Sequence, residues 1–415
     1  MGGFRAVASV VAGGAILALA GAPAGAQASW PGQWTQTGMY ASRNAVFGTG
    51  PGVSWSFNTH GPLKGQVSVV DGVAYVTTNG GRIYALDATT GKEIWMAKAG
   101  NKVMNAPIVV GSRVFVGEGN NQMLSVNPTR WIRGTGANGV IALDRGTGRL
   151  DWFLPTPGEV MGGLAYLDGT LYAADGSHWL YAIDPATGRV KWKVNDGGVD
   201  SMSSLAVAGG TIYVVTGGPA DPSVKGFSAA TGQETFSTVG HGNADNSPTV
   251  WDGIVFEENA LPISDHGKLW FRDDIEAYGG SGRLLWHHLT GEGPLPLPPH
   301  PFATPPVTVS GGVVYAGSIS SGKVYALKAQ TGQLLWSQSV GAPTYAAPLV
   351  QGGRVYTTTK AGKILALDAS TGRILGTLSV GGHFGPAYPV LVNGTLYVGN
   401  TDGMLYAVAV SRLAG

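Results

Sequence analysis

One motif, a strand followed by a Thr-Gly or Ser-Gly turn and a second strand, recurs seven times along the chain. The copies are "IYALDATTGKEIW" (83–95), "VIALDRGTGRLDW" (140–152), "LYAIDPATGRVKW" (180–192), "VKGFSAATGQETF" (224–236), "IEAYGGSGRLLW" (275–286), "VYALKAQTGQLLW" (324–336) and "ILALDASTGRILG" (364–376). Glycine suits the turn because it accepts a positive φ without a Cβ clash. Two further short strands precede each copy, as in "APIVV-GS-RVFVG" (106–117). Each unit therefore predicts a four-stranded antiparallel meander.

An eighth unit is divided between the two ends of the chain. "AYPVLVNGTLYVG" and "MLYAVAV" near the C-terminus supply three strands, and "VSWSF" (53–57) supplies the strand that carries the Trp. A ring closed by both termini leaves no free sheet edge. We therefore predict an all-β fold, an eight-bladed β-propeller, formed by residues 29–415 as a single domain.

The first 28 residues have the pattern of a signal peptide. Arg5 is followed by an apolar run from Ala6 to Ala20, and small residues allow cleavage after Ala26 or Ala28. The run is too short and too rich in glycine for a good membrane span, and no later run qualifies. We expect a periplasmic or secreted protein without a membrane span.

The charge of the chain is low and balanced. Charged residues make up 12% of the 415 residues, and the net charge is +1. A nucleic-acid partner would require a clustered basic face, so none is expected. Sparse charge is typical of a glycine-rich β protein. It also limits self-repulsion in acid, where carboxylates neutralise while Lys, Arg and His stay positive. Both interpretations are open.

The recurring Trp and Asp residues of the motif are assigned structural roles. A Trp at the end of the motif in six of the eight blades is expected to pack between blades. The recurring Asp is expected to cap its own turn. These residues are Trp55, Trp95, Trp152, Trp192, Trp286 and Trp336, with Asp87, Asp144, Asp184 and Asp368.

The long insertions all fall on one face of the predicted ring. They are the loops 118–139 and 257–274, the Pro-rich crossing 290–304 and the shorter segment 217–223. Loops carried on a rigid scaffold hold function more often than the scaffold does. We therefore expect the site on this face, over the axis.

A comparison between blades selects residues at the axis. Counting back eleven residues from the aromatic of each second strand gives one position per blade, just before the innermost strand. The eight residues are Lys64, Met104, Met161, Met202, Asp245, Thr304, Tyr345 and Pro386. Asp245 is the one carboxylate in this set and Lys64 the one cation. They lie four blades apart.

These residues have two interpretations. The methionines could fill the axial funnel, and Asp245 could cap a turn or bind water. Alternatively, an acid near apolar thioethers is partly desolvated, which raises its pKa and suits it to proton transfer in acid. His60, His241, His300 and His383 all lie in crossings between blades, and as cations in acid they would favour an anionic ligand.

The motif A-x-D-x-x-T-G-x-x-x-W resembles the repeat of pyrroloquinoline-quinone (PQQ) enzymes and their cofactor-free relatives. The enzymes of that family clamp the quinone with a disulfide between adjacent cysteines and bind calcium through carboxylate and amide ligands. This chain has no Cys, and its axial set holds a single acid. We predict no PQQ, no metal and no other cofactor. A non-catalytic scaffold, similar to the propeller lipoprotein of the outer-membrane β-barrel assembly machinery, is an alternative, although its anchoring lipid Cys is absent.

The chain also resembles the tetrathionate hydrolases of acidophilic sulfur oxidisers. The shared features are export, eight PQQ-type blades, absence of Cys, sparse charge and the crossing "GNADNSP" (242–248). The resemblance implies hydrolysis of tetrathionate to thiosulfate, sulfate and sulfur, an acid pH optimum and a homodimer. It also implies a catalytic Asp, which we assign to Asp245. Asp265, Asp273 and Asp274 are the rival acids.

A small anionic sulfur substrate fits the axial set. Tetrathionate has two sulfonate ends and a polarisable sulfur middle, so cations would hold its ends and thioethers its centre. The substrate-binding candidates are Lys64, Met104, Met161, Met202, His241, Asn246, Tyr345 and His383. Asn246, beside Asp245, is also a candidate to assist it in activating water.

Overall fold

The computed structural model describes residues 46–47, 54–127, 130–198, 203–216, 223–238, 246–265, 268–294 and 304–413. The predicted signal peptide, residues 1–28, lies outside the described residues. The described part is built of strands, with one short 3₁₀ helix, η1 (Val410–Leu413). No helix within these ranges is long and apolar enough to cross a membrane.

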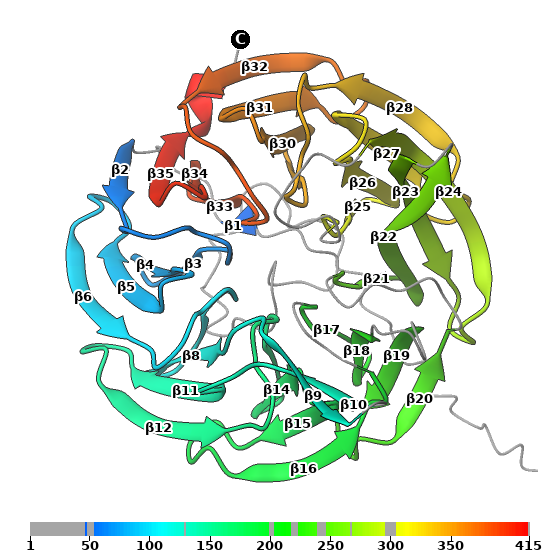
Figure 1. Cartoon of the computed structure of the whole chain (residues 1–415). Helices are drawn as coiled ribbons and strands as arrows, with labels where there is room; N and C mark the ends of the chain where they lie inside the picture. Colours follow the sequence, from blue (N-terminus) through cyan, green and yellow to red (C-terminus); the bar gives the residue numbers. More distant parts are fainter. Residues whose placement is uncertain are drawn as a thin grey trace, which may run out of the picture.

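Eight antiparallel blades surround a central axis, which confirms the predicted β-propeller (Figure 1). The first strand of each blade lies nearest the axis and the last forms the rim. Blade 1 contains β3 (Ser68–Val70), β4 (Val73–Thr77), β5 (Arg82–Asp87) and β6 (Glu93–Lys98), and blade 2 contains β7 (Ile108–Val110), β8 (Arg113–Glu118), β11 (Gly139–Asp144) and β12 (Leu150–Pro155). Blade 3 contains β13 (Ala165–Leu167), β14 (Thr170–Asp175), β15 (Trp179–Ile183) and β16 (Val190–Asn195), and blade 4 contains β17 (Ala206–Ala208), β18 (Thr211–Thr216), β19 (Ser223–Ser228) and β20 (Glu234–Ser237).

Blades 5 to 7 follow the same order. Their strands are β21 (Thr249–Trp251), β22 (Ile254–Asp265), β23 (Lys268–Tyr278), β24 (Leu284–Pro294); β25 (Thr308–Ser310), β26 (Val313–Gly317), β27 (Lys323–Lys328), β28 (Leu334–Ser339); β29 (Leu349–Gln351), β30 (Arg354–Thr359), β31 (Lys363–Asp368), β32 (Ile374–Ser379).

Blade 8 combines strands from both ends of the chain, as the divided repeat predicts. Its sheet contains β33 (Val390–Val392), β34 (Thr395–Gly399), β35 (Met404–Ala409) and β2 (Trp55–Asn58) in that order. β2 pairs antiparallel with β35, with Trp55 opposite Ala407. A further strand, β1 (Val46–Phe47), lies parallel to β33 on its inner side. The ring is therefore closed by hydrogen bonds between segments that lie far apart in the sequence.

In the six blades that carry it, the recurring Trp joins its blade to the Gly-containing turn of the next. The indole of Trp95 donates a hydrogen bond to the carbonyl of Arg145 at 2.8 Å. A Cβ placed on Gly148, in the same turn, would lie 2.6 Å from the ring of Trp95. Equivalent contacts join Trp152 to Gly188 and Trp336 to Gly372. The predicted packing role of the Trp is confirmed, and the contact explains why Trp and Gly recur together.

The recurring Asp caps its turn, as expected. Asp87 accepts hydrogen bonds from the backbone N–H groups of Thr89 and Thr90 and from the Thr90 hydroxyl. These bonds, chiefly those from Thr90, lower the pKa of Asp87. The turn is thus held by an ionised carboxylate at neutral pH.

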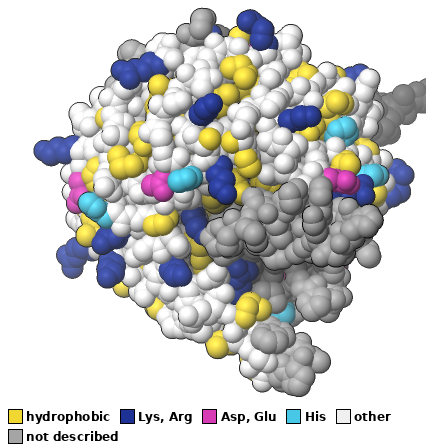
Figure 2. All heavy atoms as spheres, turned by 45° about the horizontal axis from the view of Figure 1, so that its top comes forward, with side chains coloured by type: hydrophobic (Ala, Val, Ile, Leu, Met, Phe, Trp, Pro, Cys, Tyr) yellow, Lys and Arg dark blue, Asp and Glu magenta, His cyan; other side chains and the backbone are white. Residues whose placement is uncertain are grey.

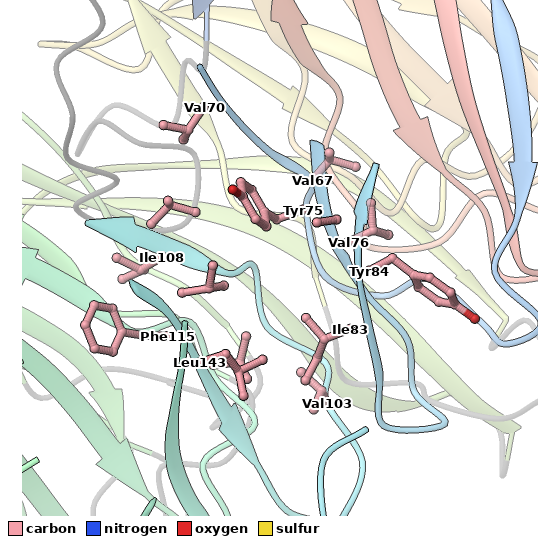
Figure 3. Close-up of a cluster of buried hydrophobic side chains, with 14 of the residues drawn as sticks. Val67, Val70, Tyr75, Val76, Ile83, Tyr84, Val103, Ile108, Phe115 and Leu143 are labelled. Carbon is pink, nitrogen blue, oxygen red and sulfur yellow. The ribbon is translucent and has the colours of Figure 1, made fainter. Parts of the chain in front are cut away.

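The hydrophobic core lies between neighbouring blades rather than at the axis. Figure 3 shows part of this core, with Tyr75, Val76 and Ile83 from blade 1 and Ile108 and Phe115 from blade 2. All five side chains are buried. Because each blade packs both faces in this way, the strands are apolar on both sides, and a buried polar side chain within them is an exception.

The insertions differ from the predicted loops. Most of 257–274 continues the strands β22 and β23, and residues 290–294 of the predicted Pro-rich crossing belong to β24. A hairpin satisfies the backbone N–H and C=O groups of an insertion, which a loop would leave to solvent. The insertion 118–139 likewise contains a two-stranded sheet, β9 (Met123–Asn127) and β10 (Arg130–Arg133).

Candidate active site

The axial residues chosen by comparing blades lie in crossings that touch one another. A Cβ on Gly65 would approach the carbonyl oxygen of Met104 to 2.9 Å, so the backbone beside Lys64 packs on that of Met104. Met161 is buried, and Lys64, Met104 and Tyr345 are half-buried. The structure therefore brings the first two blades' candidates side by side.

Three of the predicted site residues, Met202, His241 and Asp245, lie outside the described residues. Their roles stay predictions. The backbone of Asp265 belongs to β22, but its side chain lies outside the described part of the structure. His383 is exposed, and its Nδ1 lies 3.3 Å from a carboxylate oxygen of Asp402.

Asn246, which follows Asp245 in the chain, is buried and fully engaged by the protein. Its Nδ2 donates to Oδ1 of Asn259 at 2.9 Å, and its Oδ1 accepts from the Thr304 hydroxyl at 2.6 Å. Asn259 in turn donates to Glu276 at 2.9 Å. The amide of Asn246 thus links the crossing before blade 5 to the strands β22 and β23.

Blade 5 buries five carboxyl side chains close to this link. None is more than 5% exposed, and they are Glu257, Glu258, Asp273, Asp274 and Glu276. In the other seven blades the residues at the two positions of Glu257 and Glu258 are uncharged. They are Val76, Val116, Ala173, Val214, Ala316, Thr357 and Val398, and then Thr77, Gly117, Ala174, Val215, Gly317, Thr358 and Gly399. The acids are therefore a departure specific to blade 5.

One group of these acids faces blade 4. Glu257 lies directly opposite Glu276 in the β22–β23 pairing. Burial, and then the charge of Glu276, raise the pKa of Glu257 to about 8, against a smaller opposing effect of the Asn246 and Asn259 amides. Glu276 also accepts a hydrogen bond from the Tyr278 hydroxyl at 2.5 Å.

A second group faces blade 6. Burial raises the pKa of Glu258 well above its ordinary value, and repulsion by Asp273 and Asp274 adds to the rise. Burial also raises the pKa of Asp273, although hydrogen bonds from Ser320 and Ser318 lower it. Glu258 therefore holds its proton more tightly than an exposed glutamate does.

Asp274 has two basic neighbours. His287 Nδ1 lies 3.2 Å from its Oδ2, and a guanidinium nitrogen of Arg272 lies 3.8 Å from the same oxygen. Burial raises the pKa of Asp274, and His287 lowers it.

This arrangement can store and deliver protons. Carboxyl groups held neutral near pH 7 are general acids, and perturbed acids of this kind gather at functional sites. Two of them, Asp273 and Asp274, were among the acids named from the sequence. Glu257, Glu258 and Glu276 were missed, because only the position before the innermost strand was compared. Comparing the positions that follow the aromatic of the second strand would have identified Glu257 and Glu258.

The residues at this face do not fit a PQQ–calcium site. Adjacent cysteines are absent from the sequence. Within the described ranges, no group of three His, Asp or Glu side chains is arranged as metal ligands.

Surface charge does not gather into a patch of one sign on the face shown in Figure 2. Lys and Arg side chains are separated by uncharged surface, and Asp and Glu are few there.

Comparisons with known proteins agree with this architecture. The family model described as "Outer membrane protein assembly factor BamB" matches residues 45–131, 136–260 and 272–412. Among solved structures, BamB from Moraxella catarrhalis covers 85% of this chain and 98% of its own, with a TM-score of 0.60 and 16% identity. Quinohemoprotein alcohol dehydrogenase from Comamonas testosteroni covers 92% and 81%, with a TM-score of 0.66 and 16% identity. At this identity, the two structures show the fold alone.

Curated relatives add a more specific similarity. Tetrathionate hydrolase from Acidithiobacillus ferrooxidans is 30% identical over 95% of this chain and 89% of its own length. Tetrathionate hydrolase from Acidianus ambivalens is 26% identical over 84% of this chain and 71% of its own. BamB from Yersinia pestis is 25% identical over 79% and 69%. The chain therefore belongs to the PQQ-like repeat β-propeller family and is a homologue of the tetrathionate hydrolases.

Proposed function

We propose that this protein is an exported polythionate hydrolase that converts tetrathionate to thiosulfate, sulfate and sulfur. The similarity to tetrathionate hydrolases along nearly the whole chain supports the substrate class. In the structure, the observation that carries the proposal is the buried acid group of blade 5, which Asn259 joins to Asn246. We propose that the predicted signal peptide, residues 1–28, directs export of the protein. We also expect an acid pH optimum and a homodimer.

The proposed reaction balances without an external oxidant or reductant. Water oxygen bonds to the sulfur of one sulfonate, and the bond from that sulfur to its divalent neighbour breaks. The electron pair stays on the divalent sulfur, and the fragment then separates into sulfur and thiosulfate. The overall change is S₄O₆²⁻ + H₂O → S₂O₃²⁻ + SO₄²⁻ + S + 2H⁺. The protein must accept protons from water and give one to the leaving sulfur.

We assign the acid–base role to Asp245 and the binding roles to the axial residues around it. Lys64, His241 and His383 would hold the sulfonates, and the methionines at 104, 161 and 202 would contact the sulfur chain. Tyr345 contributes a hydroxyl from the same ring. Asn246 acts through position rather than by contact with substrate, because both ends of its amide are bonded to Asn259 and Thr304.

The direct test is turnover. Purified mature protein is incubated with tetrathionate at about pH 3, the acid range in which such a general acid works, and thiosulfate is followed with time. Release of thiosulfate and sulfate in equal amounts, unchanged by a metal chelator, supports the proposal. Absence of thiosulfate release from folded protein contradicts it.

A scaffold role is the second candidate, favoured by the family match to BamB. Apolar side chains are exposed along the outermost strands, among them Ile94, Leu150 and Leu334. These could contact a protein partner. A protein that is folded, inactive on tetrathionate and bound tightly to an identified outer-membrane assembly component would establish this function instead.

A further inference from the structure

The side chain of Glu258 lies at the boundary between blades 5 and 6. Side chains alternate along a strand, so Glu258 shares a face of β22 with Phe256, and Phe256 packs on Val307 and Val309 of blade 6. Glu258 is 1% exposed. Neither of its carboxyl oxygens has a hydrogen-bond partner among the described residues. An ionised carboxylate buried without a donor is costly, so the neutral acid is the stable form there.

Asp273 occupies the same face but has donors. Ala260 is its direct partner in the pairing, so Asp273 is the diagonal neighbour of Glu258, within reach of a long side chain. Its Oδ2 accepts hydrogen bonds from the Ser318 hydroxyl at 2.8 Å and from the Ser320 hydroxyl and N–H at 2.7 and 3.0 Å. Its Oδ1 is buried and has no partner within the described ranges. One carboxyl group thus lacks donors and its neighbour has three.

We propose that Glu258 and Asp273 share one proton across this boundary near neutral pH and take up a second in acid, and that the pair is the proton store of the axial site. The proposal deepens the function proposed above and rests on it. The proton moves from Glu258 to the free Oδ1 of Asp273, which leaves Glu258 as the carboxylate, and returns when the pair is reloaded. Two carboxyl groups in unequal environments divide the roles of acid and base in this way.

The pair is connected to the axis through blade 6. Ser318, which binds Asp273, accepts a backbone hydrogen bond from Thr344 at 3.3 Å. Thr344 precedes Tyr345, the axial residue of the next crossing. Burial raises the pKa of Tyr345, and the charge of Asp273 adds to the rise. The Tyr345 hydroxyl therefore keeps its proton at neutral pH, and Tyr345 is the axial residue that we assign to the proposed path.

Few charged groups face this pair. Asp274 repels Glu258 from β23. Burial raises the pKa of Tyr325 of β27, and the charges of Asp273 and Glu258 add to the rise. Its hydroxyl donates to the carbonyl of Thr290. His288 of β24 packs edge-on against Tyr325 at 6.3 Å between ring centroids, and burial lowers its pKa. Among the described ion pairs, none joins a Lys or Arg to Glu258 or Asp273. The described groups around the pair therefore favour its protonated form.

The experiment compares Glu258→Gln with the wild-type protein. Glutamine keeps the size of the neutral acid, and its amide can donate to the free Oδ1 of Asp273, so folding is expected to survive. The infrared C=O band of protonated carboxyl groups is recorded at pH 7, and kcat and KM for tetrathionate are measured across the acid range. We expect the band to lose one carboxyl, and kcat to fall about 10²-fold with KM nearly unchanged.

The matched control is Glu118→Gln. Glu118 is also a buried glutamate at the end of a second strand, but it accepts backbone hydrogen bonds from Gly100 at 2.6 Å and Asn101 at 3.1 Å. This substitution is expected to leave kcat within twofold of wild type. A similar loss in both variants would show only that buried glutamates support the fold, and would overturn the proposal.

The two proposals fail in different ways. If wild-type protein does not hydrolyse tetrathionate, the proposed function fails, and with it the role of the pair as a proton store for that reaction. If turnover is normal but the pH 7 band is the same in Glu258→Gln and wild type, the shared proton is refuted while the hydrolase stands. A Tyr345→Phe variant with wild-type kcat and pH profile would exclude the connection through blade 6.

Discussion

At the scale of single residues, the acid–base role assigned to Asp245 can be tested directly by substitution. Asp245→Asn keeps the size of the side chain and removes its titration, so the fold should survive. General acid–base steps contribute about 10²–10⁴-fold, and kcat for tetrathionate should fall by at least that order. Melting temperature serves as the check on folding. Full activity in this variant, together with an inactive Asp273→Asn, would place the acid in β23.

Buried Glu257 makes the free energy of unfolding fall as pH rises. Its pKa rises from 4.5 in the unfolded chain to about 8 in the fold. Below pH 4.5 both states are protonated, and Glu257 makes no difference. Above it the unfolded chain releases a proton that the fold retains, so the free energy of unfolding falls by about 1.4 kcal/mol per pH unit until pH reaches about 8.

Denaturant unfolding between pH 4 and pH 8 measures this effect. Wild type should lose stability as pH rises, and Glu257→Gln should lose less, with the difference growing toward pH 8. Glu292→Gln, which removes an exposed glutamate of the same blade, is the control and should follow wild type. Parallel curves for Glu257→Gln and wild type would contradict a retained proton on Glu257.

The site could be predicted from the sequence only in part, for a physical reason. A single column of the repeat selected Asp245 and Lys64 as candidates, because a charged residue among Met, Thr, Tyr and Pro is visible in the letters alone. The burial of Glu257 and Glu276 is not visible in the same way. It depends on which residues face each other across β22 and β23 and on the blade that covers them.

At the scale of elements, the Trp–turn contact predicts a difference between two glycines. Gly148 and Gly169 both have positive φ, 71° and 76°. A Cβ on Gly148 would strike Trp95 at 2.6 Å, whereas a Cβ on Gly169 meets nothing within 4 Å. Gly169→Ala should cost about 1 kcal/mol in backbone strain, and Gly148→Ala should cost about 1–3 kcal/mol more through overpacking. Equal losses in thermal unfolding would show that the contact does not constrain the turn.

The hairpin of blade 5 shows where prediction of elements from the sequence stops. Its residues 257–274 contain Pro262 and two acidic pairs and lack the alternation that marks a half-buried strand. The strand pairing nevertheless continues through Pro262, which lies opposite Phe271. The short strands elsewhere were predictable because seven copies repeat one pattern, and an insertion in one blade has no second copy to compare.

At the scale of the whole molecule, stability depends on how the ring is closed. β2 is the outer strand of blade 8, and it comes from the opposite end of the chain to its partner β35. The Trp55 indole donates to the carbonyl of Ala88 at 3.0 Å, as the Trp336 indole does to Ala369 at 2.9 Å. Gly91 lies against the Trp55 ring as Gly372 lies against Trp336. The closing boundary therefore has the same contacts as a boundary inside the chain.

Two substitutions and one deletion test whether the closing boundary is also equally strong. Trp55→Ala and Trp336→Ala should each cost about 3–5 kcal/mol, because both remove a large packed side chain. Deleting residues 29–58 should cost more, since it removes β1 and β2 and exposes the hydrogen-bonding edge of β35 to solvent and to other chains. We expect a sharply lower melting temperature and aggregation on heating. A deletion that melts like wild type would mean that blades 1 to 7 hold the ring without the closure, and that β2 is dispensable to the fold.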